Sequence, residues 1–132
     1  MSNSSTVCPP QLADLSKKNR GEAVERFVAI FLENHTVRLI DKNFRSRFGE
    51  IDLIGIHQNQ VVFLEVRFRK SGAYGSAAAS VTARKQRKLI QTARFFLCKT
   101  PWLANKACRF DVVAVTLSNG EYEIEWFQHA FY

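Results

Sequence analysis

The stretch that decides the fold is GEIDLIGIHQNQVVFLEVRFRK, residues 49–70. Its two apolar runs, 49–56 and 61–68, are separated by the polar segment HQNQ, which is of hairpin length, so the pattern predicts two paired strands. Both runs are apolar at successive positions, which is typical of central strands covered on both faces. We therefore expect an α/β fold in which helices cover a sheet.

Three carboxylates interrupt these apolar runs: Glu50, Asp52 and Glu65. Because side chains alternate across a strand, we expect Asp52 on the face opposite to Ile51 and Leu53, and Glu65 on the same face as Arg67. If the hairpin brings Asp52 and Glu65 to one face, the two carboxylates need protons, hydrogen-bond donors or a metal ion. Mg²⁺ suits such a site because it prefers hard oxygen ligands.

The residues alone also allow a structural interpretation of the same acids. In that alternative Glu50 caps a turn, and the other two carboxylates form ion pairs with nearby arginines such as Arg45, Arg47 or Arg67. The sequence pattern does not decide between an acidic pocket and separate ion pairs.

Outside this stretch, the periodicity predicts one domain, residues 20–132, after a flexible leader, residues 1–19. The last predicted strand alternates apolar and polar residues, as an edge strand would. The expected elements are a helix from Gly21 to near Asn34, a strand at 36–46, the two strands above, a small-residue loop at 71–80, a helix at 82–98 and strands at 108–117 and 122–128.

Charge is unevenly distributed along the 132 residues. The chain has 19 Lys and Arg against 12 Asp and Glu, a formal net charge of +7, and no acid lies between Arg67 and Arg109. A local excess of this kind favours a polyanionic partner such as nucleic acid. Two alternatives remain, a basic face that only provides solubility and a face that docks an acidic protein.

Several classes of protein are not indicated. No apolar run approaches the roughly 20 residues that a membrane helix needs, and residues 1–19 lack the apolar core of a secretory signal, so we expect a cytoplasmic protein without a membrane partner. The three cysteines have no Cys-x-x-Cys spacing, and the three scattered histidines are expected on the surface or in turns. Neither a disulfide framework nor a zinc site is predicted.

Six segments carry a resemblance to a known family. They are GEAVERFVAIFLENH (21–35), KNFRSRFGEIDLIG (42–55), VFLEVRFRK (62–70), SVTARKQRKLIQTARFFL (80–97), CRFDVVAV (108–115) and AFY (130–132). The chain resembles the bacterial YraN-like uncharacterised protein family, which is similar to archaeal Holliday-junction resolvases and belongs with the PD-(D/E)XK nucleases. The resemblance implies a restriction-endonuclease-like fold, with a central mixed β-sheet flanked by helices in the order αβββαββ.

The resemblance also implies roles for particular residues. Glu25 matches a helix glutamate that faces the metal, Asp52 the motif aspartate and Glu65 the motif glutamate, and together they would hold Mg²⁺ or Mn²⁺. Such an ion polarises the scissile phosphate and lowers the pKa of a bound water. The residues expected to contact nucleic acid are Arg45, Arg47, Arg69, Lys70, Tyr74, Arg84, Lys85 and Lys88.

Arg67 departs from the family pattern, which has lysine at this catalytic position. Arginine can bind a phosphate through two hydrogen bonds, but it cannot accept a proton, and its planar head does not occupy the space of an ammonium group. Arg67 could act as a charge clamp, Lys85 or Arg69 could replace the lysine, or hydrolysis could be lost while binding persists.

The expected function is therefore nucleic-acid binding by a nuclease-like fold, as a Mg²⁺-dependent endonuclease acting on branched or structured DNA. The alternative is a non-catalytic nucleic-acid-binding module that lost cleavage through Arg67. DNA is favoured over RNA as the partner, and the similarity to resolvases implies a homodimer because two strands must be cut.

Overall fold

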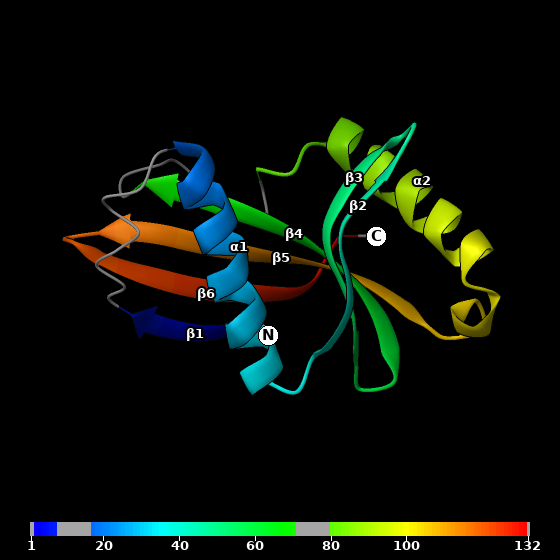
Figure 1. Ribbon diagram of the computed structural model, residues 1–132, viewed down its shortest axis with the longest axis horizontal. Coiled ribbons are helices and arrows are strands. Elements are labelled where there is room, and N and C mark those ends of the chain that lie inside the picture. Colours follow the sequence, from blue (N-terminus) through cyan, green and yellow to red (C-terminus); the bar gives the residue numbers. More distant parts are fainter. Residues whose placement is uncertain (1, 8–16, 71–79, 132) are drawn as a thin grey trace.

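The computed structural model describes residues 2–7, 17–70 and 80–131, which form a six-stranded sheet and two α-helices (Figure 1). The strands lie in the order β1-β6-β5-β4-β3-β2. Only the β4–β5 pair is parallel among the described strands, so the sheet is mixed. The elements are β1 (Ser2–Val7), α1 (Lys17–Asn34), β2 (Arg38–Ser46), β3 (Gly49–His57), β4 (Gln60–Lys70), α2 (Ala83–Lys99), the 3₁₀ turn η2 (Pro101–Leu103), β5 (Cys108–Ser118) and β6 (Glu121–Phe131).

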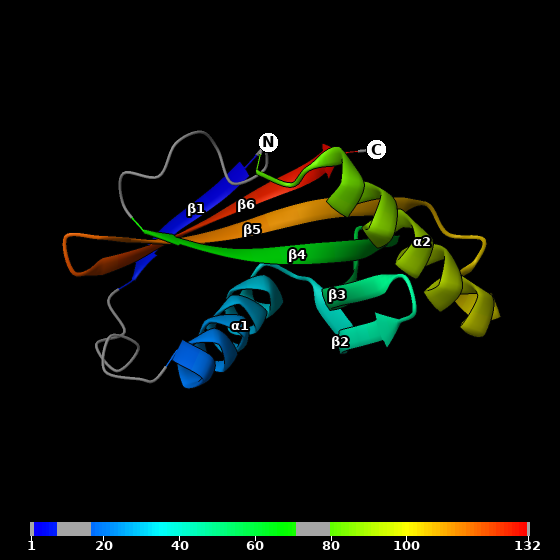
Figure 2. The same ribbon diagram turned by 90° about the horizontal axis from the view of Figure 1, so that it is seen from above.

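The two helices pack on opposite faces of the sheet (Figure 2). Alternate residues of β4 divide between two apolar clusters: Val62 and Leu64 pack in the cluster that contains α1, and Val61 and Phe63 pack in the cluster that contains α2. This explains why the run at 61–64 is apolar at successive positions, since both faces of β4 are covered. The largest side chain that is fully buried is Trp126, on the α1 face.

The β3–β4 hairpin closes through a two-residue turn. Gln58 and Asn59 have φ of 51° and 62°, the left-handed conformation that matches the twist of a tight antiparallel hairpin. Gly55 lies deeper in β3, where β2 approaches so closely that an added Cβ would be 2.8 Å from Val37 Cγ1. Both features hold β2, β3 and β4 in one register.

The parallel β4–β5 pair requires a crossover connection, and α2 is part of it. Thr82 caps this helix: its side-chain oxygen accepts a hydrogen bond from the backbone N–H of Lys85 at 3.2 Å. Pro101 follows the helix and begins η2, as expected of a residue that cannot continue an α-helix.

The predicted restriction-endonuclease-like α/β fold and the order αβββαββ are confirmed, with three differences in detail. β1 forms within residues 1–19, where no element was predicted, and α1 begins at Lys17. β6 was predicted to be an edge strand, which is wrong: it lies between β5 and β1, and the edges are β1 and β2. The loop at 71–79, including Tyr74, lies outside the described residues.

Neither helix in the described parts of the chain is long and apolar enough to cross a membrane.

Candidate functional site

Asp52 and Glu65 meet where β3 separates from β4. The two strands pair from His57 and Gln60 up to Leu53 and Leu64. Beyond that point β3 no longer pairs with the backbone of β4. The backbone N–H of Val66 instead donates a hydrogen bond to Asp52 Oδ2 at 2.8 Å. The carboxylate is therefore held beside β4, next to Glu65.

The backbone is irregular at this point, which corrects the predicted alternation in β3. Ile51 and Leu53 were expected on one face, but Ile51 packs on the α2 side and Leu53 on the α1 side. Opposite them on β2, Asn43 has a positive φ of 51°, and no backbone pairing joins Asn43 to Asp52. The irregularity turns the chain at Asp52. In β4 the alternation is regular, and Glu65 lies on the α2 side with Arg67, as predicted.

Glu65 is a buried carboxyl with a strongly raised pKa. It is 6% exposed, and burial is the main reason that its pKa rises from 4.5 to about 7, followed by the negative charge of Asp52. The positive charges of Lys85 and Arg67 act in the opposite direction. A carboxyl with such a pKa can change its protonation state near neutral pH, as groups at functional sites often do.

Two cations face the Glu65 carboxylate. Arg67 Nε lies 3.5 Å from Glu65 Oε2, and Lys85 Nζ, on α2, lies 3.6 Å from the same oxygen. The Nε atom of Arg67 is buried and makes no hydrogen bond of good geometry within the described residues. The outer part of both side chains reaches solvent, since they are 33% and 40% exposed. They can therefore contact a phosphate beside the carboxylates.

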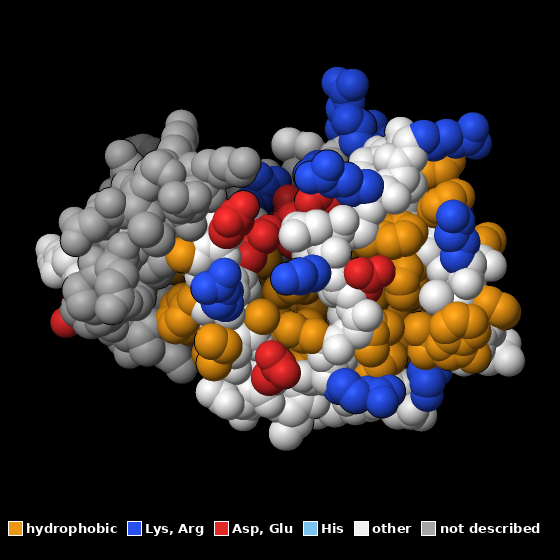
Figure 3. Space-filling model, viewed as in Figure 1, with side chains coloured by type: hydrophobic (Ala, Val, Ile, Leu, Met, Phe, Trp, Pro, Cys, Tyr) orange, Lys and Arg blue, Asp and Glu red, His pale blue; other side chains and the backbone are white. Residues whose placement is uncertain are grey.

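Glu25 lies on α1, on the other side of this acidic group. Burial raises its pKa, and the charges of Asp52 and Glu50 add to the effect, while a hydrogen bond with Asn43 lowers it. Glu25 and Asn43 line a pocket of about 300 Å³ between α1 and β2. Figure 3 shows acidic side chains gathered between α1 and the β2–β3 hairpin, with Lys and Arg side chains around them.

The donors at this site fit a hard divalent cation only in part. Asp52 and Glu65 supply adjacent carboxylate oxygens, which is the chemistry that Mg²⁺ prefers. Within the described residues, however, no three Asp, Glu, His or Cys side chains come close enough together to hold one ion. Asp52 and Glu65 would therefore hold the ion, and the assignment of Glu25 as a third ligand stays a prediction.

The predicted ion pairs of the structural interpretation are also present in part. Glu65 pairs with Arg67, as that interpretation allowed. Glu50, which was expected to cap a turn, pairs with Arg45 at 3.1 Å on the surface, with side chains 36% and 78% exposed. Asp52 instead binds a backbone N–H. The acids thus form one electrostatically linked group in which two members also have cationic partners.

The basic residues predicted to bind nucleic acid lie around this group, on the β2–β3 turn and on α2. The turn packs against the helix, since Ser46 Oγ lies 3.3 Å from Thr92 Oγ1 and a Cβ added at Gly49 would lie 3.6 Å from Lys88 Cβ. Arg47 on the turn and Lys88 on the helix are both exposed. Arg84 is exposed near the start of α2, Arg69 is half-buried on β4, and the side chain of Lys70 lies outside the described residues. Arg47 also lies over the Phe48 ring, 4.9 Å from its centroid.

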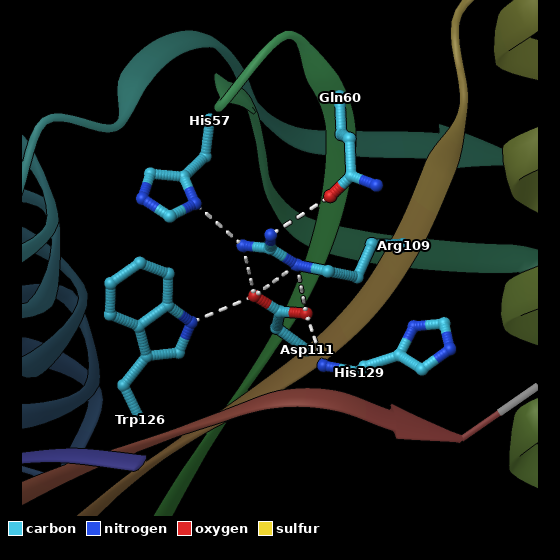
Figure 4. Close-up of polar contacts among 6 residues, drawn as sticks. All are labelled: His57, Gln60, Arg109, Asp111, Trp126 and His129. Atoms are coloured by element: carbon cyan, nitrogen blue, oxygen red, sulfur yellow. Dashed lines mark hydrogen bonds and ion pairs between the residues drawn. The ribbon is translucent and has the colours of Figure 1, made fainter. Parts of the chain in front are cut away.

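A second polar cluster, which the sequence did not predict, is buried on the face of the sheet that α1 covers (Figure 4). Asp111 is 0% exposed and accepts hydrogen bonds from Arg109 Nε at 3.0 Å, Trp126 Nε1 at 2.8 Å and the backbone N–H of His129 at 2.8 Å. Arg109 also contacts His57 Nδ1 at 2.9 Å. This cluster joins the β3–β4 hairpin to β5 and β6.

His57 is 5% exposed, so the prediction that it lies on the surface or in a turn is wrong. Burial, and then the charge of Arg109, lowers its pKa. The available signal was the pair Arg109 and Asp111, two positions apart in an apolar strand, because residues with that spacing share a face. No sequence pattern indicated that His57, Trp126 and His129 would bind this pair.

The mixed sheet with a helix on each face is the fold of a restriction-endonuclease-like α/β protein. The family described as "Uncharacterised protein family UPF0102" matches residues 24–115. The UPF0102 protein YraN of Salmonella typhi is 48% identical over 118 residues, which are 89% of this chain and 87% of that protein. The UPF0102 protein NE0719 of Nitrosomonas europaea is 47% identical over 116 residues, 88% of this chain and 96% of that protein. The chain therefore belongs to the UPF0102 family, and the predicted YraN-like membership is confirmed.

Proposed function

We propose that this protein binds nucleic acid, with branched or structured DNA favoured over RNA, and that it hydrolyses phosphodiesters with Mg²⁺ or Mn²⁺. The observation that carries the proposal is the contact between two carboxylates, Asp52 and Glu65, beside two partly exposed cations, Arg67 and Lys85. A divalent cation bound by the carboxylates supplies Lewis-acid chemistry to a phosphate and to a bound water. The two cations bind the phosphate oxygens and balance charge in the transition state.

Two further features support nucleic acid as the ligand. The exposed arginines and lysines of the β2–β3 turn and of α2 lie on the same side of the sheet as Lys85. Their charge matches that of a phosphate backbone, which gives strong and salt-dependent binding. As part of the proposal we place the protein in the cytoplasm and expect a homodimer on a two-stranded substrate.

A second candidate function is non-catalytic binding, and the position of Arg67 favours it. The arginine lies against the carboxylate at 3.5 Å and so neutralises part of the charge that an ion would need. Arginine also cannot accept a proton from water, unlike the lysine of the family pattern. In this candidate the site binds phosphate but does not cleave it.

The experiment combines binding and cleavage on the same DNA substrates. A four-way junction, a nicked duplex and a duplex are incubated with the protein in EDTA, to measure affinity, and in Mg²⁺ or Mn²⁺, to measure cleavage. We expect binding in EDTA, cleavage of the junction with metal, and no cleavage by Glu65→Gln. Glu123→Gln, at an exposed position on β6, is the matched control and should cleave normally.

Each result has a definite meaning. Cleavage that survives in Glu65→Gln comes from another site or from a contaminant, and this refutes the catalytic proposal. Cleavage that appears or increases in Arg67→Lys identifies Arg67 as the cause of low activity. If the chain binds but neither form cleaves, the non-catalytic candidate holds, and if no nucleic acid binds, both candidates fail.

A further inference from the structure

Trp102 is the most exposed large apolar side chain in the described residues, at 73%. It lies on η2, directly after α2, on a backbone that is anchored. Leu103, the next residue, is 7% exposed and anchors the turn in the core, and the backbone N–H of Leu103 donates to the carbonyl oxygen of Thr100 at 2.9 Å. The backbone that carries the indole is thus anchored through Leu103, and the indole itself is exposed.

The helix that leads to Trp102 is strongly basic on its exposed side. The α2 sequence ARKQRKLIQTARFFLCK contains no Asp or Glu. Its exposed cations continue along the helix to the end that meets η2: Arg84, Arg87, Lys88, Arg94 and Lys99. Midway along the helix, Arg87, Ile90, Gln91 and Arg94 line a shallow pocket of about 290 Å³, where cationic and apolar groups lie together.

The two ends of α2 connect this surface to the candidate site. Lys85, in the first turn, lies 3.6 Å from Glu65, and Trp102 follows the last turn. A helix of 17 residues is about 25 Å long, so the basic side of α2 spans the distance from the carboxylates to the indole. Figure 1 shows α2 running beside β2 and β3 toward the right-hand end of the molecule.

We infer that the basic side of α2 and Trp102 form a binding track for a single-stranded segment of nucleic acid. The inference rests on the proposed function. It adds that the substrate has an unpaired, single-stranded segment next to its duplex, and that this segment binds along α2. The phosphates contact Arg87, Lys88 and Arg94, and an unpaired base stacks on the indole of Trp102. Single strands are bound in this way in general, by a cationic groove together with aromatic side chains that stack on bases. A base within a duplex has both faces covered by its neighbours, so the indole selects the unpaired form.

Charge favours a nucleic-acid strand over a second copy of the chain as the occupant. A second copy would bring the same basic helix, and the two sets of cations would repel each other. The pocket at Arg87 and Arg94 provides charged and apolar contact together, which suits a phosphate and its sugar.

Tryptophan fluorescence provides a direct test, because the chain has two tryptophans and the other, Trp126, is 0% exposed. The probe is single-stranded oligothymidine of about 10 nucleotides, titrated in EDTA, with a duplex of the same length as reference. We expect the oligothymidine to quench the emission of Trp102 and to bind Trp102→Ala roughly 5- to 150-fold more weakly. Duplex affinity should be unchanged in this variant.

Two further variants separate the contributions. Ile30→Ala removes another exposed apolar side chain, 54% exposed on α1, and should leave binding unchanged. Arg94→Gln should weaken single-strand binding and reduce its salt dependence, because it removes a phosphate contact. The emission of Trp126 reports in each variant that the core is intact.

The inference is overturned if the chain binds duplex or branched DNA while Trp102→Ala binds the oligothymidine as tightly as the parent chain. In that case the proposed function stands and only the track is wrong. If no nucleic acid binds at all, the proposed function fails, and the track fails with it. If Trp102→Ala converts a dimer to a monomer in sedimentation without a change in DNA affinity, the indole belongs to an interface between copies.

Discussion

Replacing Asp111 with asparagine tests how strongly the buried cluster of Figure 4 holds the sheet together. The substitution preserves size but removes the charge that neutralises Arg109, which is 5% exposed. It also replaces one acceptor oxygen with an NH₂ group, which cannot accept a hydrogen bond. The three partners of Asp111 all donate: Arg109 Nε, Trp126 Nε1 and the backbone N–H of His129. Removing one partner of a buried ion pair costs about 3–5 kcal/mol. Since single domains are stable by about 5–15 kcal/mol, this is a large fraction of the total.

The assay is urea denaturation at neutral pH, with Glu50→Gln as the matched control. Glu50 pairs with Arg45 at 3.1 Å, almost the same distance as the 3.0 Å between Asp111 and Arg109, but on the surface. Exposed pairs contribute about 0–1 kcal/mol, so the control should lose little. If Asp111→Asn also loses less than about 1 kcal/mol, burial does not decide the strength of this pair and the reasoning is wrong.

Three other predictions concern the acidic site, the hairpin and the basic helix. The folded protein binds a proton at Glu65 with a pKa of about 7 against an ordinary 4.5, so without metal its contribution to stability falls by roughly 3 kcal/mol as pH rises through this range. Glu65→Gln should flatten that pH dependence in urea titrations with EDTA, and an unchanged slope contradicts the assignment. Gly55→Ala should lower the free energy of unfolding by about 1–3 kcal/mol, since the new Cβ would lie 2.8 Å from Val37 Cγ1. Gly21→Ala, in a helix with nothing within 4 Å, should instead raise it by about 0.5–1 kcal/mol, and equal effects at the two glycines would refute the packing argument. Arg84→Gln should reduce the slope of log affinity against log salt by about 1 for duplex DNA in fluorescence anisotropy, and an unchanged slope would remove Arg84 from the interface.

Elements with strong periodicity could be predicted from the sequence. The runs at 49–56 and 61–68 correspond to β3 and β4, because continuous β-branched and aromatic residues suit a strand that is buried on both faces. The helix predicted at 82–98 corresponds to α2, where Thr82 and Pro101 mark its limits. β1 could not be predicted in this way, because SNSSTV is polar and its place in the sheet comes from backbone pairing with β6.

The candidate site was predictable where it depends on regular alternation. Glu65 and Arg67 share a face as the spacing required, and Asp52 lies close enough to affect the pKa of Glu65. The irregular backbone between Ile51 and Leu53 was not predictable, because nothing in the local sequence marks it and it coincides with a positive φ at Asn43 in a different strand. The pairing of Asp111 with Trp126 and His129 depends likewise on contacts that only the assembled sheet provides.

The pairing of β1 with β6 has a consequence for the order in which the chain can fold. Residues 2–7 are synthesised well before the strand that they pair with, Glu121–Phe131. Trp126 and His129, which bind the Asp111 carboxylate, also belong to that final strand. The pairing of β1 and the closure of the Asp111 cluster therefore have to wait until β6 is available, as contacts between distant parts of a chain generally form late.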